Sequence, residues 1–435
     1  MEPKLLLDDR VVFTCQNSGA CCRNVWLIGV DRAAHERLRK VDWSRVDPAL
    51  PSGEKFVPLA GPLPGGEAMT FARTPAGACV FLTPEQKCSI HANLGGRAKP
   101  QICREFPYHF VRTPDGVAVG VSFACTAVRG HQGAPLAAQR AEILDVLSGS
   151  TRVRTLPEPL SLYAELGVTW EEYQAIEEGL LAILADTTAP LPRALIGGSA
   201  LISVCVGLAQ LEANARRAER PADETLLGGL AKLRDERYRR ILAIAGTARY
   251  PARPSLVPLA PLWTWLEFSA RRLGRAGLVV ALYRNWFRFW RGRGSLPDLV
   301  TGGAPVPIEA VRRVHFDADH PAIGPLLREY WSHVVFRKTL TPMHGVFRGY
   351  QTMLALYALM KWVAKLGALR AGRPTVAPAD VRDAVRLVEQ RFVLHARFAD
   401  LFDLHPLLTA MADRLYRQPA FVRGAALEPP RNPVE

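Results

Sequence analysis

Hydrophobic residues recur every three to four positions through most of the chain after residue 135, which is the spacing of one face of an α-helix. Thr169 followed three residues later by Glu172 has the pattern of a capping box at a helix start. Breaks rich in Pro and Gly at 250–262 and 293–307 interrupt the periodicity. The pattern predicts helices near residues 136–147, 168–186, 193–215, 223–245, 321–338, 343–369 and 378–401.

The first 134 residues have a different pattern, in which short apolar runs alternate with turns. Residues 77–91 (GACVFLTPEQKCSIH) predict a short strand, a turn at Pro84 and a second strand. Residues 116–125 (GVAVGVSFAC) predict another strand, which ends at Cys125. We therefore expect a mainly α protein with a small α+β domain at 1–134 and a larger all-helical region at 135–435.

The composition is that of a folded protein with an excess of positive charge. Hydrophobic residues make up 49% and charged residues 22% of the 435 residues, which argues against wholesale disorder. The formal net charge is +14, and arginine supplies most of it. Such a charge attracts anionic surfaces and ligands, but it does not choose among them.

No segment predicts export or a membrane span. The N-terminus has acidic residues by position 9 and no apolar core of a signal peptide, so we expect a cytoplasmic protein. The longest uncharged run, Leu195–Leu211, contains three Gly and two Ser and is marginal in length for a span. We expect it to be a buried helix.

Cysteine usage carries the strongest chemical signal. Seven of the eight cysteines lie between residues 15 and 125, and this crowding in a chain without an export signal favours thiolate metal ligands over disulfides. Cys205 lies in an apolar run and is expected to be a core residue. The predicted ligands are Cys15, Cys21, Cys22, Cys79, Cys88, Cys103 and Cys125.

The number of thiols leaves the metal open. Zinc takes four Cys or His ligands in a tetrahedron, and a four-iron cluster takes four thiolates. Seven thiols exceed either requirement, so two zinc ions, or one cluster with supporting thiols, both fit the count.

The cysteine motifs resemble a known family. The segments are F-x-C-x-x-x-G-x-C-C (13–22), C-x-F-L (79–82), C-S-I-H (88–91) and K-P-x-x-C-R-x-F-P (99–107). In order and spacing they resemble the YkgJ-type cysteine-cluster proteins, described as zinc- or iron-chelating domains, which include the flagellin lysine N-methylases. Two positions depart from the family: Ser18 stands where a second cysteine is usual, and Lys99 stands where Arg is common. The C-terminal part resembles the methylase branch weakly, in REYW (328–331), Tyr350, Tyr357, Arg391 and His395.

This resemblance implies a specific activity. It implies a 4Fe-4S cluster beside an S-adenosylmethionine site, and methyl transfer to lysines of a flagellin-like protein substrate. Arg104 and Tyr108 are then candidate cofactor-binding residues, and Tyr108 and His109 are candidates for the proton acceptor. The alternative is a zinc- or iron-binding scaffold protein without catalytic activity, which requires fewer assumptions. Conventional nucleotide-binding and nucleophile motifs are absent from the sequence.

Two further segments invite a functional interpretation. Residues 281–294 (ALYRNWFRFWRGRG) interleave Arg with aromatic residues, as single-stranded nucleic-acid platforms do. We favour an amphipathic helix with its aromatics in the core and expect no nucleic-acid partner. Residues 314–320 (VHFDADH) carry two His and two Asp, which we expect to form turns and helix caps rather than a metal site.

Overall fold

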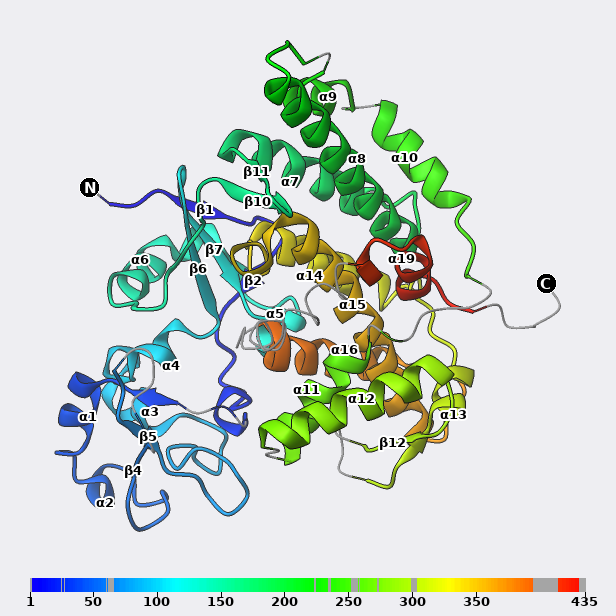
Figure 1. Cartoon of the computed structure of the whole chain (residues 1–435). Coiled ribbons are helices and arrows are strands. Elements are labelled where there is room, and N and C mark those ends of the chain that lie inside the picture. The colour runs from blue at the N-terminus through cyan, green and yellow to red at the C-terminus, as the bar shows by residue number, and fades with distance from the viewer. Residues whose placement is uncertain are drawn as a thin grey trace. The chain divides into compact units, whose positions relative to one another are not determined.

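The computed structural model describes residues 2–429, except for residues 25, 27, 60, 62–65, 223, 234–235, 252–256, 258, 272–273, 299–302 and 394–413. The chain divides after Thr155 into two compact units, an N-terminal and a C-terminal one. The N-terminal unit mixes short helices with small sheets, and the C-terminal unit is almost entirely helical (Figure 1). The expected fold class, mainly α with an α+β N-terminal part, is confirmed.

A four-stranded sheet forms one part of the N-terminal unit. β6 and β7 form an antiparallel hairpin in which Thr113 pairs with Gly116 across a turn of Pro114 and Asp115, residues suited to tight turns. β1 and β9 pair in parallel with this hairpin on either side. The order is β1 (Leu5–Leu7), β7 (Gly116–Val121), β6 (Tyr108–Thr113) and β9 (Arg154–Thr155).

The N-terminal unit extends further than the predicted boundary at residue 134. β9 completes the four-stranded sheet, and α6 (Arg140–Ser148) packs on α4 (Gln101–Glu105). These contacts between residues distant in sequence cannot be read from local periodicity. The predicted helix at 136–147 begins as the 3-10 helix Leu136–Gln139 and continues as α6.

The remaining elements of this unit are short. A second sheet is antiparallel, with β5 between β3 and β4, and β2 pairs with β8. Asp31 caps α1 by accepting a 2.8 Å hydrogen bond from the amide of Ala34. The bounds are β2 (Val12–Phe13), β3 (Gly29–Val30), α1 (Arg32–Leu38), α2 (Trp43–Val46), β4 (Phe56–Pro58), β5 (Met69–Phe71), α3 (Ser89–Leu94), α5 (Thr126–Arg129) and β8 (Ala134–Pro135).

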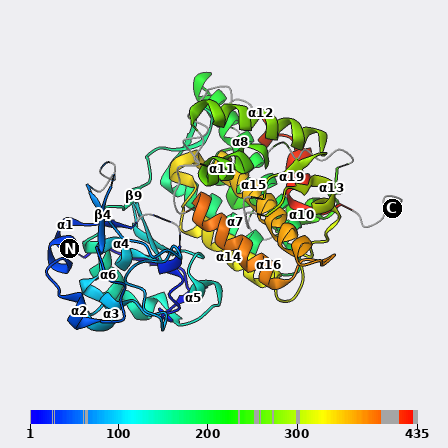
Figure 2. The ribbon, with the colours of Figure 1, turned by 90° about the horizontal axis from the view of Figure 1, so that it is seen from below.

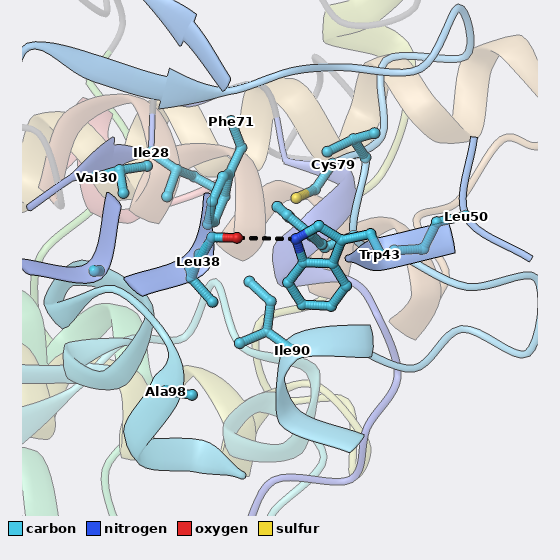
Figure 3. Close-up of a cluster of buried hydrophobic side chains, with 12 residues drawn as sticks. Ile28, Val30, Leu38, Trp43, Leu50, Phe71, Cys79, Ile90 and Ala98 are labelled. Carbon is cyan, nitrogen blue, oxygen red and sulfur yellow. Dashed lines mark hydrogen bonds between the residues drawn. The ribbon is translucent and has the colours of Figure 1, made fainter. Parts of the chain in front are cut away.

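A compact hydrophobic core connects these short elements (Figure 3). Trp43 packs edge-on against Phe81 at 4.8 Å between ring centroids, and its indole Nε1 donates a 3.1 Å hydrogen bond to the carbonyl of Leu38. Cys79 is buried within this core, and Cys22, Cys88 and Cys103 pack against it. The cysteines are therefore fixed at the edge of a packed core.

The C-terminal unit is built around one long helix, α15 (Thr341–Arg370), which is buried along most of its length (Figure 2). Helices α8, α11, α13, α16 and α19 contact it. A kink interrupts α15 at Gly345, where φ is +70° and an added Cβ would lie 2.5 Å from the carbonyl oxygen of Ser161. Glycine is required there because β10 approaches the helix closely.

The other elements of this unit follow the periodicity closely. The capping box of Thr169 and Glu172 is confirmed. The expected helix 223–245 corresponds to two helices, α9 and α10. Of the expected helix 378–401, residues 378–393 form α16 and a π-helical turn, Glu389–Val393, and residues 394–401 lie outside the described residues. The helices are α7 (Trp170–Ala185), α8 (Leu191–Arg217), α9 (Leu226–Leu233), α10 (Glu236–Gly246), α11 (Leu259–Arg271), α12 (Arg275–Arg291), α13 (Ile308–Arg313), α14 (Gly324–Phe336), α16 (Pro378–Val388) and α19 (Pro419–Ala426). The strands are β10 (Leu160–Tyr163), β11 (Leu166–Val168), β12 (Ser295–Leu296) and β13 (Val306–Pro307).

In the part of the chain that the structure describes, two helices are long and apolar enough to cross a membrane by length and composition. They are α8, whose most apolar window is 44% buried, and α15, whose window is 83% buried. The burial of α15 is that of a core helix. α8 buries Cys205, as expected, but exposes Val204 and Leu211.

The aromatic residues of α12 do not all lie in the core, contrary to expectation. Phe289 is buried, but Phe287 and Trp290 are exposed. The interpretation failed because the aromatic residues do not share one face of the helix: Phe289 lies on the buried face, and Phe287 and Trp290 lie on the exposed one.

Candidate metal centre

The first two cysteine segments are hydrogen-bonded to each other. The amide of Cys79 donates a 2.8 Å hydrogen bond to the carbonyl of Cys22. Gly19, with φ of +62°, lies so close to the second segment that an added Cβ would be 2.9 Å from the carbonyl oxygen of Gln86. Any larger residue at position 19 would therefore separate the two segments.

The second segment makes a tight turn rather than a hairpin of two strands. Thr83 donates its amide to Lys87 at 2.9 Å, and Leu82 and Cys88 form an isolated bridge. Both predicted strands are wrong: Cys79 makes only an isolated bridge with Arg73, and Cys88 stands at the start of helix α3. The free amides of Ile90 and His91 there donate to the Cys88 sulfur.

The remaining two predicted ligands also lie on or beside short helices. Cys103 is within α4. Cys125 precedes α5, where the amides of Ala127 and Val128 donate to its sulfur, whereas the strand expected to end there ends at Val121. Amide donors at a sulfur stabilise its thiolate form, which is the form that binds metals.

Five thiols form one electrostatically coupled group, which we call the inner thiols. The sulfur atoms of Cys21 and Cys22 are 3.9 Å apart, and Cys22 also hydrogen-bonds Cys88. Cys103 experiences the charges of Cys21, Cys79 and Cys88. The inner thiols are Cys21, Cys22, Cys79, Cys88 and Cys103.

Hydrogen bonding divides the inner thiols into protonated and ionised members. Hydrogen bonding with Cys22 lowers the pKa of Cys21 to about 7 and that of Cys88 to about 6. The pKa of Cys22 itself is raised, because it holds the shared proton between two thiolates. Cys21 and Cys88 are thus available as thiolates near neutral pH.

Burial and a nearby cation act in opposite directions on the group. Burial raises the pKa of Cys79 to about 11 and raises that of Cys103. The ammonium of Lys99 attracts the thiolates of Cys21, Cys88 and Cys103 and lowers their pKa values. A bound metal ion would add positive charge at the same place.

Cys15 and Cys125 form a second group, the outer thiols. Cys125 experiences the charges of Cys15 and Cys21, which makes Cys21 the link between the two groups. Ser18, at the position where a cysteine is usual, shares a 2.8 Å hydrogen bond with Thr126, next to Cys125. The hydroxyl at position 18 therefore holds the first segment against the start of α5.

The two candidate cofactor-binding residues have protein partners. Arg104 donates a 2.7 Å hydrogen bond to Asp145 and a weaker one to Gln101. Tyr108 donates its hydroxyl hydrogen to Gln139 at 3.3 Å, and burial raises its pKa. Tyr108 experiences the charges of Cys15 and Cys125, so it lies beside the outer thiols.

Two residues at the site were not singled out from the sequence. Lys99 was noted only as a departure from a motif, although its charge bears on three thiols. Arg73 donates to the carbonyls of Cys22 and Trp26, and its charge lowers the pKa of Cys79. Arg73 lies outside the cysteine motifs, so no local signal identified it.

The residues of the weak C-terminal resemblance are part of the helical core. Tyr330 donates a 3.0 Å hydrogen bond to Glu389, and Tyr350 donates one of 2.8 Å to the carbonyl of Leu195. Tyr357 is fully buried. Arg391 accepts a hydrogen bond at its carbonyl from Trp265, and His395 lies outside the described residues.

Residues 314–320 form turns and a helix cap, as expected. Asp319 accepts a 3.2 Å hydrogen bond from the amide of Leu191 at the start of α8. Asp317 and His320 accept from amides two residues further along the chain. These hydrogen bonds give the segment a structural role and do not point to a metal ligand.

The donor set fits a thiophilic metal, although its side chains are not drawn together into a cage. Among the residues that the structure describes, no three Cys, His, Asp or Glu side chains are close enough to enclose an ion as they stand. Soft thiolates and amide donors at sulfur are properties of zinc and iron–sulfur sites.

Comparison with known proteins agrees with this chemistry. Residues 14–125 match the model of the CxxCxxCC family, a putative zinc- or iron-chelating domain. The matched segment contains all seven clustered cysteines, and it confirms the resemblance of the N-terminal part to the cysteine-cluster proteins. No curated protein and no solved structure matches the chain.

Proposed function

We propose that the N-terminal unit binds one thiophilic metal centre through four of the five inner thiols. The observation that carries this proposal is the gathering of thiols at the edge of one core, where the Cys21 and Cys22 sulfurs are 3.9 Å apart and the Cys79 amide donates to the Cys22 carbonyl. A four-iron cluster takes four thiolates, and a zinc ion takes four Cys or His ligands, which four thiolates also satisfy. The outer thiols then remain as a second, dispensable set.

The finer proposal is an iron–sulfur protein of the lysine N-methylase type. Its support is the resemblance of the cysteine motifs and the presence of more thiols than one zinc ion requires. S-adenosylmethionine would supply the methyl group, and a lysine of a flagellin-like protein would accept it. The thiolate chemistry requires a reducing compartment, so we place this activity in the cytoplasm.

This proposal leaves the proton acceptor unassigned. A lysine must lose a proton before its amine can attack a methyl group. Because burial raises the pKa of Tyr108 and its hydroxyl donates to Gln139, Tyr108 stays protonated and is a poor acceptor. It can instead orient a ligand through hydrogen bonding.

A second candidate, a zinc-binding scaffold, is favoured by one distance. Two sulfurs on one tetrahedral zinc, with Zn–S bonds of about 2.3 Å, lie about 3.8 Å apart. The Cys21 and Cys22 sulfurs are 3.9 Å apart. In a four-iron cluster each thiolate binds a different iron, so neighbouring sulfurs lie farther apart.

Metal and acid-labile sulfide analysis of the anaerobically purified full chain tests whether a metal centre is present and which type it is. Iron with matching sulfide and a broad brown absorption would support the methylase type. Stoichiometric zinc in a colourless protein would support the scaffold. Substoichiometric metal of either kind after anaerobic purification and reconstitution would refute the metal centre itself.

Binding of S-adenosylmethionine then separates enzyme from scaffold. The metal-loaded protein should bind it saturably in calorimetry if the methylase proposal is correct. The Cys88→Ser variant should lose this binding, and Cys205→Ser should retain it. Absence of saturable binding to the metal-loaded wild type would leave the scaffold.

A further inference from the structure

Helix α12 exposes a stripe of large hydrophobic side chains. The exposed fractions are 52% for Val279, 63% for Val280, 69% for Tyr283, 45% for Phe287 and 62% for Trp290. At 3.6 residues per turn these five positions fall within an arc of about 100°. We call these five residues the α12 stripe. A contiguous exposed apolar surface of this kind marks an interaction site.

The opposite face of α12 already holds the helix in the fold. Leu278 and Phe289 are buried, and Phe289 packs against Trp362 of α15 at 5.7 Å between ring centroids. Asn285 donates hydrogen bonds of 3.1 Å to Thr264 and Glu267 of α11, the neighbouring helix in Figure 1. The α12 stripe is therefore not needed to anchor the helix.

Arginine borders the α12 stripe. From residue 268 to residue 297 the sequence contains seven Arg and no Asp or Glu. Arg291 lies over the ring of Phe287 at 4.6 Å, and Arg293 is exposed just beyond the helix. Arg312 of α13 approaches Gly292 at the same end, whereas Arg284 is paired with Glu267. The end of the stripe near Trp290 is therefore cationic.

We propose that the α12 stripe docks on an anionic phospholipid membrane surface, with α12 lying in the plane of the interface. Aromatic and aliphatic side chains on one face with arginine at the border are the features of an interfacial helix. Trp and Tyr suit the interface because each has an apolar ring with a polar edge. The cationic border complements anionic headgroups.

Other occupants fit the contacts less well. A nucleic-acid platform needs free ring faces, but Trp286 and Trp290 stack on each other at 6.2 Å and Arg291 covers Phe287. A second copy of the chain would bring two cationic borders together without an acidic partner on α12. An anionic lipid surface can bury the apolar α12 stripe and pair its headgroups with the bordering arginines.

Vesicle flotation with the metal-loaded full chain tests the proposal. Vesicles of phosphatidylcholine and phosphatidylserine in equal amounts should bind the protein about tenfold or more tightly than phosphatidylcholine alone, because about two arginines act at the surface. Raising the salt concentration should weaken this binding. Equal, weak partition onto both vesicle types would overturn the charge argument and the proposal.

Two variants distinguish vesicle binding through the α12 stripe from binding through any exposed hydrophobic side chain. Phe287→Ser with Trp290→Ser should lower vesicle binding by about tenfold or more, because apolar area is no longer buried. The matched control is Ile244→Ser, which removes a side chain 70% exposed on α10 and should leave binding unchanged. Both variants should match the wild type in circular dichroism and thermal melting.

Three results would overturn the proposal. One is vesicle binding that survives in the folded Phe287→Ser, Trp290→Ser variant. The second is self-association in sedimentation, abolished by that variant, without vesicle binding, which would make the occupant a second copy. The third is salt-sensitive binding of single-stranded oligonucleotides without vesicle binding.

Discussion

The amide of Cys79 donates a 2.8 Å hydrogen bond to the carbonyl of Cys22, so two cysteines 57 positions apart are joined through their backbones. This bond fixes the separation of the two segments before any metal binds. The thiols of the inner group can therefore converge without a large loss of backbone entropy. It also predicts that the ligand residues act as one unit.

Replacing any one of the four inner thiols that bind the metal should remove most of it. Cys22→Ser, Cys79→Ser and Cys88→Ser each remove a thiolate from a set in which four are required. We expect less than about half of the wild-type metal content for each in elemental analysis. Cys205→Ser, which changes a buried core residue of the other unit, is the control and should retain all of it. Full metal content in Cys88→Ser would remove this residue from the ligand set.

Metal affinity should fall steeply between pH 7 and pH 5. The pKa of Cys21 is about 7 and that of Cys88 about 6, so protons compete with the metal for these sulfurs below those values. Competition titration with a chromophoric chelator measures this dependence. A pH dependence that is no steeper below pH 7 than above it would show that these two thiols do not bind the metal.

Removing the charge of Lys99 should raise the pKa values of the nearby thiols in the metal-free protein. Lys99→Gln removes the cation that lowers the pKa values of Cys21, Cys88 and Cys103, so all three should rise. Thiolate absorption or alkylation rates against pH in the metal-free protein report the shift. Lys87→Gln, which removes an exposed lysine from the turn that precedes Cys88, should not change the titration.

The helical part of the fold could be predicted well because its signal is local. The helices α7, α8 and α15 end within two residues of the predicted 168–186, 193–215 and 343–369. α9 and α10 were expected as one helix because both show the hydrophobic period of a helix. α11 was missed because it begins inside a segment assigned to a proline-rich break.

The site could be predicted only in its composition. The sequence identified seven thiols, but their division into inner and outer groups depends on contacts between distant segments. Cys22 meets Cys79 and Ser18 meets Thr126 through the packing of short elements that have no periodicity. Arg73 and Lys99 act through charge at a distance, which no motif records.

Low pH should weaken the attachment of the C-terminal segment to α15. Glu428 binds Lys361 at 3.1 Å and also pairs with Lys365. Burial alone would raise the pKa of Glu428, but the two lysines outweigh it and hold the pKa below its usual 4.5. A lowered pKa stabilises the fold above about pH 4.5, and this contribution is lost as the pH falls through the folded value. Glu428→Gln should therefore melt below wild type at neutral pH and like wild type in acid.

The buried ion pair of Arg337 and Glu389 should be the most sensitive point of the helical unit. Two hydrogen bonds of 2.8 Å join the guanidinium to the carboxylate, and both side chains are fully buried. Arg337→Met leaves the Glu389 charge buried without its cation, which should cost about 3–5 kcal/mol of unfolding free energy. The double variant Arg337→Met, Glu389→Leu removes both charges and should recover a large part of that loss. Urea unfolding followed by circular dichroism measures both values, and a single variant within about 1 kcal/mol of wild type would contradict the buried pair.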